Sequence, residues 1–136
     1  MVNIRLAQSY LKRCKIRYEI LIVLNKKRAY ADVIREAQEA IELLQKALLI
    51  NIGMQPPKWH DVSDILIENL KAFPEEHREE IRRLQRPAKW LRSQREIAFY
   101  GDSDFIPDES YTREDAKTAL EAAKKYLEIA EEIIRI

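Results

Sequence analysis

Glycine is scarce in this sequence, and its scarcity limits the class of fold. The chain has two glycines in 136 residues, whereas an average protein contains about 7% glycine. Sandwiches, barrels and glycine-rich phosphate loops use more of this residue. With 46% hydrophobic and 35% charged residues, the composition predicts an all-α protein, and the length predicts a single domain over residues 1–136.

Cysteine is scarce as well, and long apolar runs and an excess of one charge are missing. The single cysteine, Cys14, excludes an internal disulfide and a cysteine-based zinc site. No apolar run is long enough for a signal peptide or a membrane span, so we expect a cytoplasmic protein without membrane contact. Lys and Arg number 24 against 23 Asp and Glu, a formal net charge of +1. Contact with nucleic acid would therefore need a local basic patch.

Apolar residues recur every three or four positions in the segments that follow Asn3, which predicts amphipathic helices. Cys14 lies on the first apolar stripe, so we interpret it as a small buried side chain without a redox role. The stripe loses its phase across residues 25–28, which predicts a break between two antiparallel helices. Gly53 is placed to end the second of them.

The second half of the chain predicts one short helix and two long ones. Asp61 is suited to cap the short helix. A broken stripe begins at Glu75 and ends at Gly101, with Pro87 predicting a kink or a split. Residues 102–110 are predicted to form a loop, and Thr112 starts the last stripe. The pattern predicts an antiparallel up-down four-helix bundle with one short accessory helix.

Most catalytic signatures are absent from the sequence. We find no glycine-rich phosphate loop, nucleophile elbow or paired-histidine metal motif, and we expect no metal and no cofactor. His77 lies in a charged run that predicts a solvated surface residue. His60 directly precedes the predicted cap Asp61, where free backbone amides attract anions. His60 therefore either contacts an anion or closes the preceding connection with a structural hydrogen bond.

Arg95 falls where the stripe of its helix requires an apolar side chain. Three explanations remain open: the stripe reaches the surface there, Arg95 forms a buried pair with a carboxylate such as Glu42, or it lies in a functional cationic cleft. Glu42 and Lys46 are four residues apart, in the order that favours a surface ion pair. Residues 26–28, Lys-Lys-Arg, form the one tight basic cluster, which a solvated turn explains without a ligand.

Two parts of the sequence contain ordered sets of residues that together form a recognisable pattern. The first set is Ala31, Arg35, Glu36, Ala37, Gln38, Glu39, Ala40, Glu42, Lys46, Ala47, Leu48, Leu49, Gly53, Pro56 or Pro57, His60 and Asp61. The second set is Arg95, Glu96, Phe99, Tyr100, Gly101, Asp102, Ile106, Pro107, Tyr111, Asp115, Ala116 and Ala119. The first set resembles the core signature of the HEPN domain family (higher eukaryotes and prokaryotes nucleotide-binding), a helix reading A-x-x-A-x-E-x-x-x-K-A-L-L followed by glycine, proline and H-D, and the second resembles the closing part of its prokaryotic members. The resemblance implies a small antiparallel helical bundle.

The resemblance also implies partners and an activity. HEPN domains commonly form homodimers, are often encoded with a minimal nucleotidyltransferase as a toxin-antitoxin pair, and in many branches are metal-independent ribonucleases. Their ribonuclease motif is an arginine, four to six residues, then a histidine, in a cleft at the dimer interface. Neither His60 nor His77 has an arginine at that distance before it. The nearest match is Arg95, four residues, then Tyr100, and tyrosine is a poor general base at neutral pH.

The departure from the motif favours a binding or interaction module over an enzyme, and we assign no catalytic residue. We expect a homodimer that acts with a minimal nucleotidyltransferase and binds a nucleotide or RNA. Lys46, His60 and Arg95 would contact phosphate, with Asp61 and Glu42 as orienting partners. Two alternatives stay open: a ribonuclease with a degenerate motif formed by Arg95 and Tyr100, or a purely structural bundle.

Overall fold

The computed structural model describes residues 2–58 and 61–134, and this part of the chain is helical and contains no strand. The four long helices are α1 (Ile4–Lys26), α2 (Tyr30–Asn51), α4 (Glu75–Tyr100) and α6 (Arg113–Ile133). The short elements are α3 (Val62–Glu68), the 3-10 helix η1 (Leu70–Ala72) and α5 (Pro107–Ser110). The predicted all-α class is confirmed. Within the described ranges, no helix is both long and apolar enough to cross a bilayer.

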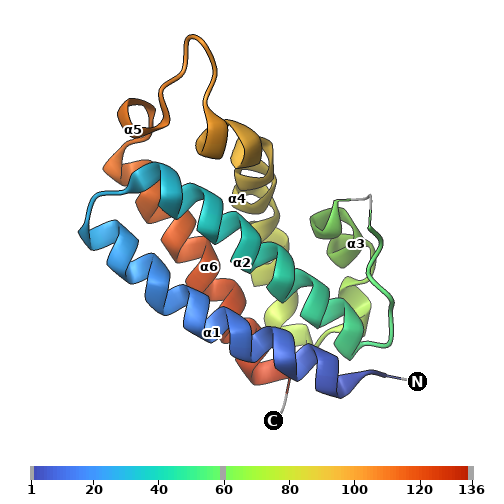
Figure 1. Cartoon of the computed structure of the whole chain (residues 1–136). Coiled ribbons are helices and arrows are strands. Elements are labelled where there is room, and N and C mark those ends of the chain that lie inside the picture. The colour runs from blue at the N-terminus through green and yellow to red at the C-terminus, as the bar shows by residue number, and fades with distance from the viewer. Residues whose placement is uncertain (1, 59–60, 135–136) are drawn as a thin grey trace.

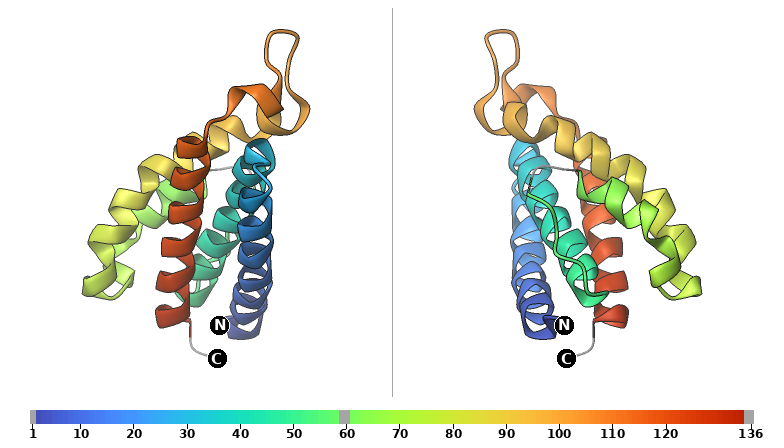
Figure 2. Two further views of the ribbon diagram at one scale, coloured as in Figure 1. Left: turned by 90° about the vertical axis from the view of Figure 1, so that its left-hand side faces the viewer. Right: turned by 90° about the vertical axis from the view of Figure 1, so that its right-hand side faces the viewer.

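Helix α2 lies at the centre of the molecule and packs against α1, α4 and α6 (Figure 1). Successive long helices run in alternating directions, but α4 tilts away from the other three (Figure 2). Helices α2 and α6 run in the same direction and pack directly on each other. A regular up-down bundle would place these two helices on a diagonal. The specific up-down four-helix arrangement predicted from the sequence is therefore not confirmed.

The boundaries of the first two helices follow from local hydrogen bonds. Asn3 caps α1, because its Oδ1 accepts a hydrogen bond from the amide of Leu6 at 3.2 Å. Arg28 has a positive φ of 61° between α1 and α2, which reverses the chain at the predicted break. Gly53, with φ 88°, follows the end of α2, and its amide donates to the carbonyl of Ile50 at 3.0 Å. The predicted end of the second helix is confirmed.

The later boundaries confirm two predicted caps, exclude one of the two outcomes expected at Pro87 and correct the extent of one loop. Asp61 caps α3, and Thr112 and Asp115 form a capping box at the start of α6. Helix α4 continues through Pro87 and is not split there. The segment 102–110 is not entirely a loop, because its last four residues form the one-turn helix α5. Proline at the first position of α5 suits a helix start.

The core lies between α2 and the helices around it. Helix α6 contributes several alanines to this core, so its backbone approaches α2 closely. Cys14 is 1% exposed, and its thiol lies 3.4 Å from the carbonyl oxygen of Ala40, which confirms the prediction of a small buried side chain. Gln45 is buried among these residues and donates to Ser63 at 2.7 Å and to Tyr126 at 3.1 Å. These hydrogen bonds tie α2 to α3 and α6.

Candidate functional site

Glu42 is the centre of a polar cluster that joins α2 to α4. Its Oε2 accepts a hydrogen bond from Gln38 Nε2 at 3.0 Å and lies 3.6 Å from Arg95 Nη1. Its Oε1 lies 3.5 Å from Lys46 Nζ. Gln38 and Lys46 are one helical turn before and after Glu42, so α2 itself sets this geometry. Two cations share one carboxylate, which leaves the cluster with a net positive charge.

Arg95 combines two of the explanations that the sequence left open. It pairs with Glu42, as one of them proposed, but 48% of its side chain is exposed. The pair is therefore at the surface and not buried. An exposed guanidinium keeps donors free for a ligand, so this geometry is also compatible with a functional role.

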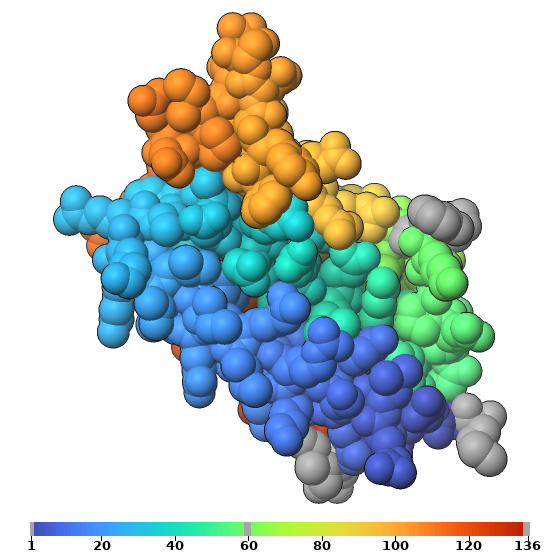
Figure 3. Space-filling view, in the orientation of Figure 1, coloured from blue at the N-terminus to red at the C-terminus, as the bar shows by residue number. Residues whose placement is uncertain are grey.

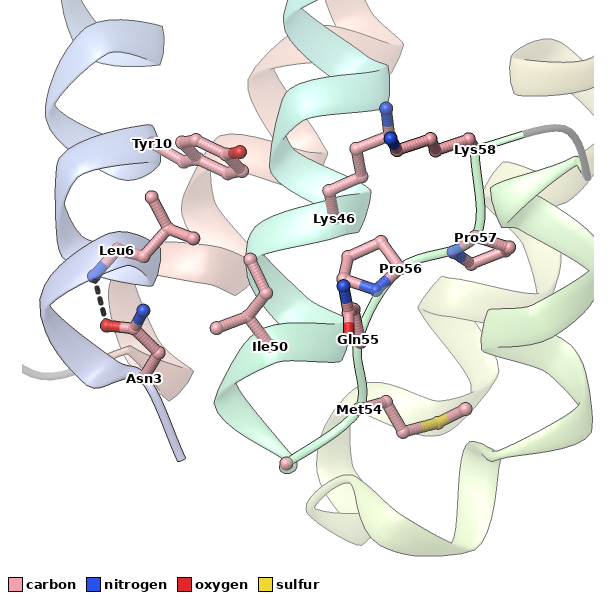
Figure 4. A pocket seen from close by; sticks show the side chains of 11 residues that line it. Asn3, Leu6, Tyr10, Lys46, Ile50, Met54, Gln55, Pro56, Pro57 and Lys58 are labelled. Atoms are coloured by element: carbon pink, nitrogen blue, oxygen red, sulfur yellow. Dashed lines mark hydrogen bonds between the residues drawn. The ribbon is translucent and has the colours of Figure 1, made fainter. Parts of the chain in front are cut away.

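A pocket of about 580 Å³ lies next to Lys46, at the end of the molecule where α1 begins and α2 ends. The segment 53–58 closes its other side. Lys46 and Lys58 extend toward the same side of the pocket, and Leu6, Ile50 and Pro56 form apolar parts of its wall (Figure 4). No Asp or Glu side chain is among the described residues that line it.

The lining of this pocket suits a ligand with an anionic end and an apolar end. Lysine ammonium groups bind phosphate as point charges. Lys58 forms no ion pair with another residue of the described ranges, and Lys46 has Glu42 as its one partner there. Tyr10 and Gln55 add polar groups to the same pocket. Polar and apolar groups thus contribute almost equally to the wall of the pocket, so a ligand that fits it needs both kinds of surface.

Asp61, expected from the sequence to orient the phosphate-contacting residues, forms its ion pair with a lysine of α4. Its Oδ1 accepts a hydrogen bond from the Ser63 amide at 2.9 Å, and its Oδ2 lies 3.5 Å from Lys89 Nζ on α4. Lys89 also lies 2.8 Å from Asp64, and this hydrogen bond lowers the pKa of the Asp64 carboxyl. Asp61 has no ion pair with Lys46 or Arg95 in the described part of the chain. His60 lies outside the described residues.

Tyr100 ends α4 and is 77% exposed. It follows Arg95 by five positions, which corresponds to about 140° around a helix of 3.6 residues per turn. The two side chains therefore leave α4 on different faces. The ring of Tyr100 meets that of Phe99 edge-on, with centroids 4.7 Å apart. Arg35 of α2 lies over the Phe99 ring at 4.1 Å, a contact that the sequence did not predict.

The prediction of a solvated His77 is wrong. Its side chain is 13% exposed, and its Nε2 lies 2.9 Å from Glu132 Oε2. The start of α4 lies beside the end of α6, which covers this histidine despite its charged neighbours in sequence. Among the described residues, no group of three or more His, Cys, Asp or Glu could hold a metal ion.

The structure thus brings together Glu42, Lys46 and Arg95, and it adds Gln38 and Lys58, which the sequence did not single out as ligand contacts. Lys58 follows two prolines, and no periodic pattern connects it with Lys46. Only the fold of the segment 53–58 across the end of α2 brings both lysines to one pocket.

Comparison with known proteins supports the resemblance seen in the sequence. The family model of the HEPN domain matches residues 7–133, nearly the whole chain. No curated protein and no solved structure matches the chain. The matched range includes α2, α4, α6 and α1 except its first three residues, together with the polar cluster around Glu42 and most of the residues that line the pocket. The chain therefore belongs to the HEPN domain family.

Proposed function

We propose that residues 1–136 act as one HEPN domain that binds a nucleotide in the cytoplasm and serves as an interaction module. In this proposal the domain is an antiparallel up-down four-helix bundle, with the tilted α4 as one of its helices and α3 as its accessory helix. One observation carries the proposal: Lys46 belongs both to the polar cluster around Glu42 and to the lining of the pocket. A ligand phosphate at Lys46 would therefore meet a second lysine and lie near a half-exposed arginine.

The residues of the site have separate roles in this proposal. Lys46 and Arg95 contact the phosphate, and Glu42 holds both cations in place through contacts of 3.5 and 3.6 Å. His60 is a further phosphate contact, and Asp61 orients it from the start of α3. Tyr100 offers an exposed ring on which a base can stack. The apolar wall at Ile50 accommodates the less polar part of the ligand.

The partners of the domain are proposed on the family resemblance. We propose a homodimer that works with a minimal nucleotidyltransferase in a toxin-antitoxin pair. The lack of an arginine four to six residues before a histidine favours this role over ribonuclease activity. A degenerate ribonuclease that uses Arg95 and Tyr100 is the alternative. It requires the two side chains to meet across a dimer, because they leave α4 on different faces.

A binding titration tests the proposal. The wild type is titrated with a fluorescent mononucleotide and with a short single-stranded RNA, and its mass in solution is measured by light scattering. Lys46→Ala and Arg95→Ala should each weaken binding about tenfold or more, because each removes a charged hydrogen-bond donor. Lys117→Ala is the matched control, since Lys117 is an exposed lysine on α6 outside the site.

Two results would contradict the proposal. One is a wild type that binds neither probe, and the other is an equal loss of affinity in the Lys117→Ala control. Cleavage of the RNA that disappears in both Arg95→Ala and Tyr100→Phe would instead support the ribonuclease alternative.

A further inference from the structure

Positive charge is concentrated at the start of the chain. Residues 1–31 contain eight of the 24 Lys and Arg side chains and one of the 23 Asp and Glu side chains. This segment therefore carries a net charge of +7 and the remaining residues carry −6, which the total of +1 conceals. Most of the segment is helix α1.

Most of these cations form no ion pair with another residue that the structure describes. In the described part of the chain, Arg17 is the residue of α1 that forms ion pairs, with Glu36 at 3.5 Å and Glu39 at 3.2 Å. Lys12, Lys15 and residues 26–28 are all exposed and have no ion pair there. The basic cluster at residues 26–28, which the sequence analysis explained as a solvated turn, is thus one end of a longer basic surface.

An apolar stripe of α1 lies between Lys12 and Lys15 at one end and the basic residues 26–28 at the other. Ile16, Ile20 and Val23 are 53%, 48% and 51% exposed. Their spacing of four and three residues places them on one face of α1, opposite the face that buries Ala7 and Cys14 in the core. We call this stripe, with Lys12, Lys15 and residues 26–28 at its ends, the α1 outer face. Figure 3 shows α1 along the outside of the molecule, with no other element in front of it.

From this face we propose that α1 docks a separate protein through an amphipathic helix whose apolar stripe is bordered by Asp and Glu. The three apolar side chains provide the anchor, and the flanking cations select acidic neighbours. Two copies of the α1 outer face packed on each other would bring like charges together, so a second copy is a poor occupant. A nucleic acid would place phosphates against the apolar stripe, which gains little from such a contact. The proposal does not depend on nucleotide binding at Lys46.

Fluorescence anisotropy with a designed peptide tests this docking. The probe is a labelled 20-residue helical peptide with leucine at every third or fourth position and glutamate beside the leucines. The full-length protein should bind it saturably, and affinity should fall as salt is added. Ile20→Ser and the pair Lys12→Glu and Lys15→Glu should each weaken binding at least fivefold. Ile106→Ser and Lys117→Glu are the matched controls, because both residues are exposed and lie outside α1.

Parallel measurements give the outcomes that would overturn the proposal. These are the absence of saturable binding, equal binding of a peptide with lysine in place of glutamate, or wild-type affinity in the α1 variants. A dimer that Ile20→Ser converts to a monomer in sedimentation would assign the face to a second copy. Binding to anionic vesicles or to RNA that the α1 variants lose, without peptide binding, would assign it to a membrane or a polyanion. Circular dichroism of each variant confirms that it is folded.

Discussion

Replacing Arg95 by alanine separates a ligand-binding role of this residue from a structural one. Its guanidinium lies 3.6 Å from Glu42, and 48% of the side chain is exposed. After the substitution, Glu42 still has Lys46 at 3.5 Å and Gln38 at 3.0 Å, so no charge is left without a partner. Exposed pairs contribute about 0–1 kcal/mol. We therefore expect Arg95→Ala to lower the free energy of unfolding by less than about 1 kcal/mol.

Urea and thermal unfolding measure this difference. For a chain of this size, a loss of 1 kcal/mol lowers Tm by roughly 4 °C or less. Arg82→Ala is the matched control, because Arg82 is exposed on the same helix and forms no ion pair with a described residue. A double-mutant cycle with Glu42→Ala gives the coupling between the two partners, which should also stay below about 1 kcal/mol.

A large loss of stability would refute this reasoning. Breaking a buried pair costs about 3–5 kcal/mol, so a loss in that range would make Arg95 a structural anchor of α4. A weaker affinity of Arg95→Ala for nucleotide would then reflect a damaged fold. A small loss of stability together with a large loss of affinity would support direct contact with the ligand.

Two further predictions concern the backbone and the buried thiol. Gly101 has φ 72°, and a Cβ there would lie 2.7 Å from the Phe105 carbonyl oxygen, whereas a Cβ at Gly53 would lie 3.6 Å from Val2. Urea unfolding should show Gly101→Ala destabilised by about 2 kcal/mol or more and Gly53→Ala by less; equal losses would contradict this. Burial raises the pKa of Cys14 to about 12, so a disulfide reagent at pH 8 should label it only in urea. The unfolded thiol ionises near pH 8.5, so between roughly pH 9 and 12 only the unfolded state loses this proton. The free energy of unfolding of the wild type, relative to that of Cys14→Ala, should therefore fall by about 1.4 kcal/mol per pH unit in this range. A difference between the two proteins that does not change with pH would count against this prediction.

The helices could be predicted because their signals are local. Asn3 and Thr112 bond to amides three residues ahead, and Gly53 supplies the positive φ that ends α2. Pro87 shows the limit of such signals, since its ring and missing amide cost about 3 kcal/mol inside a helix. Leu84 and Ala88 are buried on either side of it. Their packing offsets the local cost, and α4 continues.

The exposure of individual side chains was predicted less well than the helix boundaries, because it depends on elements that are distant in sequence. His77 has glutamates on both sides in the sequence, but its cover comes from Glu132, 55 positions later. Arg95 lies on an apolar stripe between the buried residues Leu91 and Ala98 and is nevertheless half-exposed, because its side chain extends to Glu42 at the surface of α2. Neither outcome follows from the identity of neighbouring residues.

In the candidate site, single side chains combine a contact that is local in sequence with one to a distant part of the chain. Asp61 uses Oδ1 for the amide two residues ahead, which capping rules predict, and directs Oδ2 to Lys89, 28 positions away. Glu42 uses Oε1 for Lys46, one turn along α2, and Oε2 for Arg95 on another helix. A carboxylate has two oxygens, so it can satisfy a local rule and still make a tertiary contact that the rule does not specify. The sequence singled out both Asp61 and Glu42 as candidate site residues, but only the fold determines that Glu42, and not Asp61, contacts Lys46 and Arg95.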